Sequence, residues 1–161
     1  MNPADGPRPS ARMALAAALL AIDPTGLGGV ALRGRPGSVR DSWLALLRRQ
    51  LPDGSPWLRV PTHAGDAALL GGLDLTATLE TGRPVAQQGL LARADQGVLL
   101  LPMAERVTPG AASHLAAVLD SHRVVLAREG LNQCSPARLA LVALDEGADD
   151  GERLPATLLE R

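Results

Sequence analysis

Residues 89–103 read GLLARADQGVLLLPM, and the run VLLL at 98–101 contains no polar side chain. A short, continuous apolar run between turn residues predicts a strand that is buried on both faces. The predicted strand covers residues 97–101, and Pro102 ends it because proline lacks the amide that would pair with a neighbouring strand. Three more short segments rich in apolar residues predict strands, at residues 29–33, 57–60 and 137–144. Strands that are apolar on both faces are typical of parallel sheets covered by helices.

Segments with helix-forming composition or helical periodicity separate these strands. They cover residues 11–21, 38–50, 74–81 and 109–120, and a last short helix is expected to end at Arg161. Ser10 is the predicted N-cap of the first helix. Residues 123–127 and 131–134, joined through a glycine turn, predict an inserted β-hairpin. The fold class is therefore α/β, a three-layer sandwich with a mainly parallel sheet, whose functional edge lies at the carboxyl ends of the strands.

The length and the terminal composition predict one structured unit. Residues 1–10 contain three prolines among polar residues and are expected to form a disordered arm. Residues 11–161 are expected to form one compact domain, because the chain of 161 residues is too short for two domains of ordinary size.

Composition excludes several classes of function. All sixteen basic residues are arginine, so neither a Schiff-base lysine nor a phosphate-binding lysine is possible. The net charge of −1 and the absence of Phe and Tyr argue against a nucleic-acid partner. The single Cys134 permits no internal disulfide and suits a reducing compartment, so we expect a cytoplasmic protein. The longest apolar run, residues 14–22, is too short to span a membrane.

The turn after the first strand lies where a nucleotide-binding protein carries its phosphate loop. The pattern G-x-x-x-x-G-K-[ST] needs glycine, lysine and a hydroxyl at its last three places, but this chain has Val39, Arg40 and Asp41 there. Asp41 would repel a phosphate, and we expect it to form a capping box with Ser38 at the start of the helix. The residues of this altered loop are Gly34, Gly37, Ser38, Val39, Arg40 and Asp41. We predict that the loop does not bind nucleotide.

Acidic residues after the strands offer no clear metal site. Nucleotide hydrolases place Asp-Glu directly after a strand like 98–101, for Mg²⁺ and the attacking water, whereas this chain has Pro102 and Met103. Glu105 lies further on and is expected to be solvated. The acidic loop at 145–151 matches no calcium-binding spacing and is also expected to be solvated. No paired histidines suggest zinc, so no metal site is predicted.

Five stretches together resemble the AAA+ module of magnesium chelatase. They read GLDLTATLETG at 72–82, GLLARADQGVLLL at 89–101, VVLAREG at 124–130, SPARL at 135–139 and LLER at 158–161. That family has an active I-type ATPase subunit and a related D-type subunit, whose AAA+ module is degenerate in bacteria that make bacteriochlorophyll. The departures at the phosphate loop and after residue 101 make this chain resemble the N-terminal module of the D-type subunit.

The resemblance implies a role in inserting Mg²⁺ into protoporphyrin IX, the first committed step of chlorophyll and bacteriochlorophyll synthesis. In that family the H-type subunit binds porphyrin, and the I-type subunit is the one that hydrolyses ATP. The D-type subunit joins the I-type in a ring-shaped assembly and links it to the H-type. The lid, the linker and the integrin-I-like domain of a full D-type subunit are absent from these 161 residues.

The resemblance implies a non-hydrolysing module that binds no cofactor itself, with ATP and Mg²⁺ acting in the partner. The alternative is a regulatory nucleotide-binding module, or a weakly active ATPase, that uses Arg40 in place of lysine.

Two features are candidates for contact with partners. Arg128, Glu129 and Gly130 form the expected tip of the hairpin, which is either an assembly contact or a solvated turn. The resemblance makes Arg161 a candidate arginine finger that completes the ATP site of a neighbouring subunit, with Arg153 as the substitute if the register is shifted.

Overall fold

The computed structural model describes residues 9–61, 63–149 and 151–159. Its centre is a four-stranded parallel sheet in the order β1-β8-β5-β2. The strands are β1 (Gly29–Arg33), β2 (Trp57–Arg59), β5 (Val98–Leu101) and β8 (Ala140–Asp145). The predicted parallel sheet is confirmed, and every residue of the central strand β8 is buried.

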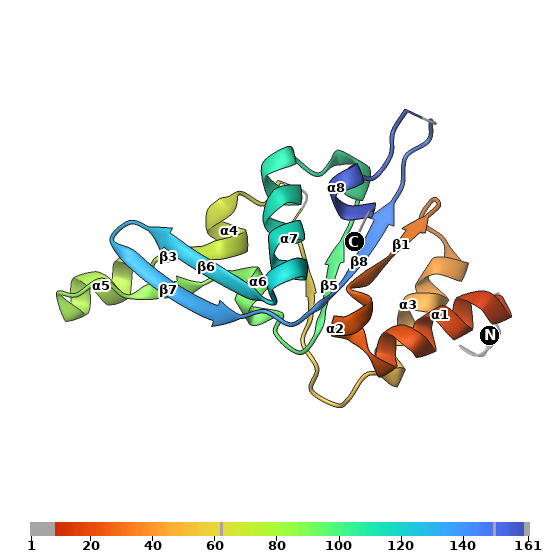
Figure 1. Ribbon diagram of the computed structural model, residues 1–161, viewed down its shortest axis with the longest axis horizontal. Helices are drawn as coiled ribbons and strands as arrows, with labels where there is room; N and C mark the ends of the chain where they lie inside the picture. The colour runs from red at the N-terminus through yellow and green to blue at the C-terminus, as the bar shows by residue number, and fades with distance from the viewer. Residues whose placement is uncertain (1–8, 62, 150, 160–161) are drawn as a thin grey trace.

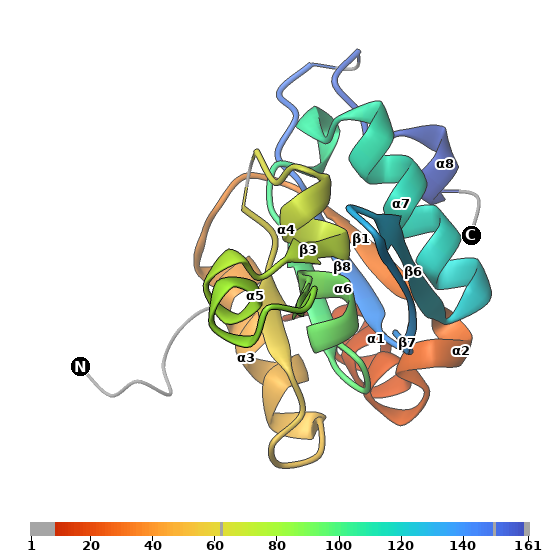
Figure 2. The same cartoon turned by 90° about the vertical axis from the view of Figure 1, so that its left-hand side faces the viewer.

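Helices cover both faces of this sheet, as a three-layer sandwich requires (Figures 1 and 2). One face packs against α1 (Ala11–Ile22) and α3 (Ser38–Gln50). The other face packs against α7 (Pro109–Ser121) and against the shorter helices α4 (Asp66–Leu70), α6 (Leu90–Arg93) and α8 (Ala156–Leu159).

The alternation of strand side chains divides the core into two layers. Val142 of β8 packs in the layer of α1 and α3, whereas its neighbours Leu141 and Ala143 pack in the layer of α7. The first layer centres on Trp43, which is fully buried. Its indole Nε1 donates a 2.7 Å hydrogen bond to the carbonyl oxygen of Met13 and so joins α3 to α1.

An arm projects from one end of the sandwich, at the left of Figure 1. It contains the hairpin of β6 (Arg123–Arg128) and β7 (Leu131–Pro136), the helix α5 (Leu75–Thr81), and a ribbon of β3 (Gly71–Leu73) with β4 (Ala86–Gln88). The hairpin and α5 are predicted by the sequence, but the ribbon is not. Its strands have only three residues each, too few to show a period of two.

Two single-turn helices complete the fold. They are α2 (Pro24–Leu27), which follows α1 directly, and the 3-10 helix η1 (Ala104–Arg106), which follows β5. The predicted cap of α1 is confirmed, since the amide of Met13 donates to Ser10 Oγ at 3.4 Å. Residues 1–8, which belong to the N-terminal segment predicted to be disordered, lie outside the described residues.

Candidate functional site

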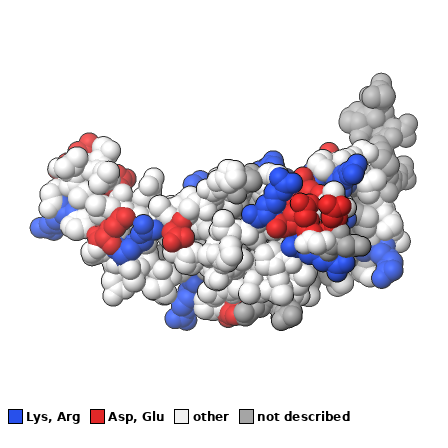
Figure 3. Space-filling view, turned by 90° about the horizontal axis from the view of Figure 1, so that it is seen from above, with Lys and Arg blue, Asp and Glu red and all other residues white. Residues whose placement is uncertain are grey.

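The carboxyl ends of β1, β5 and β8 meet at one edge of the sheet, the edge at which an α/β protein of this type places its ligands. Figure 3 shows this edge from above, where acidic side chains gather between basic ones over the end of β8. The charged residues that contact one another here are Arg33, Arg40, Glu105, Arg106, Asp145 and Glu146.

Arg40 lies in the first turn of α3, at the place of the phosphate-binding lysine. Its Nη1 donates a 2.7 Å hydrogen bond to Oε1 of Glu146, which follows β8 directly. The two side chains are only 16% and 21% exposed, so this ion pair is largely shielded from water. The guanidinium of Arg40 is therefore already matched by a carboxylate of the same chain.

Glu105 contacts the Glu146 member of this ion pair. Its Oε2 accepts a 2.9 Å hydrogen bond from the amide of Glu146, and its Oε1 lies 3.5 Å from Nε of Arg106. The expectation that Glu105 is solvated is wrong, because its side chain is 2% exposed. The cause is the backbone of Met103, whose φ of 46° turns the chain into η1 and carries Glu105 beneath the loop that follows β8.

Asp145 connects the start of this loop to the end of β1. Its Oδ2 lies 4.0 Å from Nη1 of Arg33, and its Oδ1 accepts from the amide of Gly147 at 3.0 Å. Its carbonyl oxygen accepts from the amide of Gly34 at 2.9 Å. The expectation of a solvated acidic loop is thus wrong for Asp145, which is 5% exposed, and for the half-buried Glu146, because Asp145 is the last residue of the buried strand β8 and Glu146 follows it directly.

The capping box predicted at the start of α3 is also wrong. Gly37 is the N-cap, Ser38 is already helical, and no side chain caps this end of the helix. The helix starts one residue earlier than a box requires, so the amide of Asp41 donates to the carbonyl oxygen of Gly37 at 3.0 Å. Asp41 itself remains an exposed carboxylate in the first turn of α3, where Val39 is 41% exposed.

These residues do not suit a magnesium nucleotide. The buried carboxylates at this edge already accept bonds from guanidinium and amide groups, and Pro102 and Met103 carry no metal ligand of the preferred kind. Across residues 9–61, 63–149 and 151–159, no cluster of three or more His, Cys, Asp or Glu side chains has the geometry to hold a metal ion.

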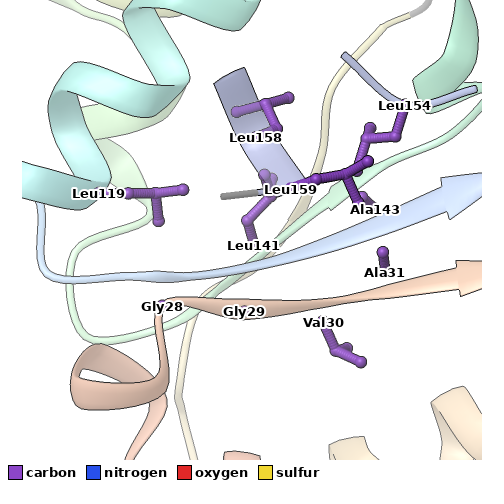
Figure 4. A pocket seen from close by; sticks show the side chains of 10 residues that line it. All are labelled: Gly28, Gly29, Val30, Ala31, Leu119, Leu141, Ala143, Leu154, Leu158 and Leu159. Carbon is purple, nitrogen blue, oxygen red and sulfur yellow. The ribbon is translucent and has the colours of Figure 1, made fainter. Parts of the chain in front are cut away.

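Two cavities flank β1. One of about 360 Å³ lies beside the altered loop and is lined by Met13, Ala31, Leu32, Arg33, Gly34, Arg35, Val39 and Arg40. The other, of about 180 Å³, lies between β1 and α8. Figure 4 shows its aliphatic lining, which includes Leu119, Leu141 and Leu158. None of the described residues that line this second cavity has a titratable side chain, so these residues supply no acid, base or nucleophile.

The predicted hairpin tip is at the far end of the molecule from this edge. Glu129 and Gly130 are exposed and have φ values of 54° and 76°, so they form the tight turn between β6 and β7. The side chain of Glu129 has a partner within the chain, because its Oε2 accepts a 3.0 Å hydrogen bond from the amide of Leu73 in β3. The tip is thereby fixed to the β3–β4 ribbon.

Of the two candidate arginine fingers, Arg161 lies outside the described residues, and Arg153 is exposed.

No helix within the described ranges combines the length and the apolar character needed to cross a lipid bilayer.

No protein-family model matches the chain. Curated relatives do match it. The magnesium-chelatase 60 kDa subunit of Cereibacter sphaeroides is 44% identical over 153 residues, which cover 95% of this chain and 24% of the relative. The 67 kDa subunit of Chlorobaculum tepidum is 35% identical over 136 residues, covering 84% of this chain and 22% of the relative.

The smaller chelatase subunit is similar at lower identity. The 38 kDa subunit of Cereibacter sphaeroides is 30% identical over 178 residues, covering 91% of this chain and 53% of the relative. A solved structure described as the complex between subunits BchI and BchD of magnesium chelatase matches with a TM-score of 0.71 at 26% identity. That match covers 92% of this chain and 55% of the solved one.

This chain spans about a quarter of the length of the 60 and 67 kDa relatives. The solved match confirms the AAA+ fold that the sequence predicts. In Cereibacter sphaeroides the 60 kDa subunit is more similar to the chain than the 38 kDa subunit is. The chain therefore belongs to the magnesium-chelatase family, in the group of the 60 and 67 kDa subunits, the D-type.

Proposed function

We propose that this chain is a non-hydrolysing AAA+ module of the D-type subunit of magnesium chelatase. It assembles with the I-type ATPase and couples that ATPase to the porphyrin-binding H-type subunit as Mg²⁺ is inserted into protoporphyrin IX. The solved complex of BchI with BchD supports the I-type subunit as the partner. The ring shape of the assembly, the link to the H-type subunit and a place in bacteriochlorophyll synthesis follow from the family resemblance.

The observation that carries this proposal is the ion pair between Arg40 and Glu146. The Glu146 carboxylate, 2.7 Å from Nη1, neutralises the charge of Arg40, so a nucleotide phosphate that took the place of this carboxylate would break one ion pair to form another. Displacement would leave a partly buried carboxylate without its cation, a state that costs several kcal/mol in protein interiors. The negative charge of Asp41 in the same turn also opposes an incoming phosphate. ATP and Mg²⁺ therefore act in the partner and not in this module.

A regulatory nucleotide site is the second candidate function. The cavity of about 360 Å³ beside the altered loop favours it, because aliphatic side chains and three arginines share its lining. Arginine remains charged and can hold phosphate, so Arg40 would take the role of the lysine in this alternative.

Calorimetry of the chain with Mg·ATP, beside a turnover assay, separates the two candidates. We expect neither measurable binding heat nor turnover for the wild-type chain. Glu146→Gln leaves Arg40 without a carboxylate partner, so this variant should gain affinity for the nucleotide if the ion pair is what excludes it. Micromolar binding by the wild-type chain that is lost in Arg40→Ala would overturn the non-hydrolysing assignment and support the regulatory site.

A further inference from the structure

The outer face of α1 carries apolar side chains where a surface helix normally carries polar ones. Leu15, Leu19 and Ile22 are 60%, 48% and 79% exposed. The inner face of the same helix is packed in the core, because Ala17 and Leu20 are buried against the sheet and α3. The helix is therefore apolar around its whole circumference, which is typical of a helix with neighbours on both sides.

The exposed residues follow the spacing of a helix–helix seam. Arg12, Leu15, Leu19 and Ile22 are separated by three, four and three positions, the alternation of the a and d positions of a coiled coil. The twelve residues of α1 extend over about 18 Å, so the seam fits one helix of similar length. Figure 1 shows α1 at the periphery of the sandwich, with α3 on its inner side and the arm at the opposite end.

The charges at the two ends of the seam indicate which helix packs against it. Arg12 lies in the first turn and Asp23 directly follows the last turn, and no charged residue lies between them. Arg12 is at the unfavourable end of the α1 dipole, because cations are stabilised at carboxyl ends and anions at amino ends. Asp23 follows the carboxyl end of α1 and is also the N-cap of the short helix α2. Within the described part of the chain Arg12 has no ion-pair partner, and Asp23 uses Oδ1 to accept from the amide of Gly26 at 2.8 Å.

We infer that this face of α1 is an interface with a second copy of the chain, whose α1 runs antiparallel. In that arrangement Arg12 of each copy lies near Asp23 of the other, and each charge meets the favourable end of the other helix dipole. A parallel arrangement would bring the two arginines together at one end. The antiparallel pairing is two-fold symmetric, so one surface supplies both halves of the contact. The inference goes beyond the proposed function, which concerns contact with different subunits.

Sedimentation of the chain over a concentration series tests the inference. We expect a reversible dimer, and Leu19→Glu at the centre of the seam should raise its dissociation constant about 100-fold, since it places two charges in an apolar contact. Leu79→Glu is the matched control, because Leu79 is 84% exposed on the distant helix α5 and its change should leave the dimer intact. Circular dichroism of both variants checks that the fold is retained.

Cysteine cross-linking tests the orientation. In a Cys134→Ser background, a mixture of Leu15→Cys and Leu19→Cys chains should form a disulfide between copies, because pairing Arg12 with Asp23 sets Leu15 of one copy opposite Leu19 of the other, whereas Leu15→Cys alone should not. A chain that stays monomeric, a dimer indifferent to Leu19→Glu, or cross-linking of Leu15→Cys with itself would overturn the inference. So would a monomer in which Leu19→Glu abolishes binding of the ATPase subunit, since α1 would then contact that subunit. None of these outcomes changes the binding of Mg·ATP, which tests the proposed function separately.

Discussion

The guanidinium of Arg40 and the carboxylate of Glu146 lie 2.7 Å apart although 106 positions separate them in the chain. The pair joins the first turn of α3 to the loop after β8, and the bond from the Glu146 amide to Glu105 adds the segment after β5. Three segments that reach the carboxyl edge of the sheet are thus tied to one another by side chains of the protein itself.

Loss of one partner from this network should destabilise the fold. We expect Arg40→Ala to lower the free energy of unfolding by about 2 kcal/mol, because Glu146 is left partly buried without its cation. Urea unfolding measures the change. Arg35→Ala is the matched control, since Arg35 is exposed in the same loop and should shift the free energy by less than about 0.5 kcal/mol. Equal effects of the two substitutions would show that the ion pair contributes nothing specific.

A second ion pair predicts a dependence of stability on pH. Burial raises the pKa of Asp95, but the hydrogen bonds and the charge of Arg138 outweigh that effect and hold the pKa below its usual value of 3.8. A carboxyl whose pKa is lower in the folded state stabilises the protein fully above the unfolded value and loses this contribution as pH falls through the folded one.

Asp95→Asn should therefore destabilise the chain at pH 6 and have a smaller effect at pH 3. Urea unfolding of the variant and of the wild type at both pH values checks this. An effect of the same size at pH 3 and pH 6 would mean that the charge of Asp95 is not what stabilises the contact with Arg138.

The hairpin tip should lose its anchor when Glu129 is shortened. Glu129→Ala removes the acceptor for the amide of Leu73, so hydrogen exchange at that amide should accelerate about tenfold. Glu129→Gln keeps an acceptor oxygen at the same place and is the control. If Glu129→Ala leaves assembly with the I-type ATPase intact, the tip is a solvated turn and not a partner contact.

Arg161 should act on a neighbouring ATP site. In a full-length D-type protein mixed with the wild-type ATPase, Arg161→Ala should preserve the complex and lower ATP turnover at mixed interfaces. Arginine fingers contribute about 10³–10⁵ in rate, so the loss should be large at each affected site. Arg153→Ala tests the alternative register. Unchanged turnover and magnesium insertion with the complex intact would leave Arg161 without a role in the ATP site.

Local patterns in the sequence predict most of the sandwich. The strands predicted at 29–33 and 97–101 are present with nearly those bounds, and the helix at 38–50 has the predicted limits, because continuous apolar runs and helical periodicity are local properties. The β3–β4 ribbon is missed because its pairing depends on the surrounding arm and not on its own six residues.

The charged edge of the sheet is harder to predict from sequence, because its contacts join distant segments. Glu105 and Asp145 look like surface carboxylates in isolation, and only the return of the chain across the sheet buries them. One signal was available. Glu105 comes after β5 and Asp145 is the last residue of β8. The carboxyl ends of these parallel strands share an edge, so acids there are expected to approach the start of α3.

The indole of Trp43 also gives the molecule an intrinsic optical reporter. The chain contains no Tyr and only two Trp, so its near-ultraviolet absorption and fluorescence arise almost entirely from Trp43 and Trp57. Trp43 is fully buried and bonded to the carbonyl oxygen of Met13, whereas Trp57 is half-buried, with Arg48 5.7 Å above its ring. Separation of α1 from α3 would expose Trp43 and shift the emission toward longer wavelength, without any added label.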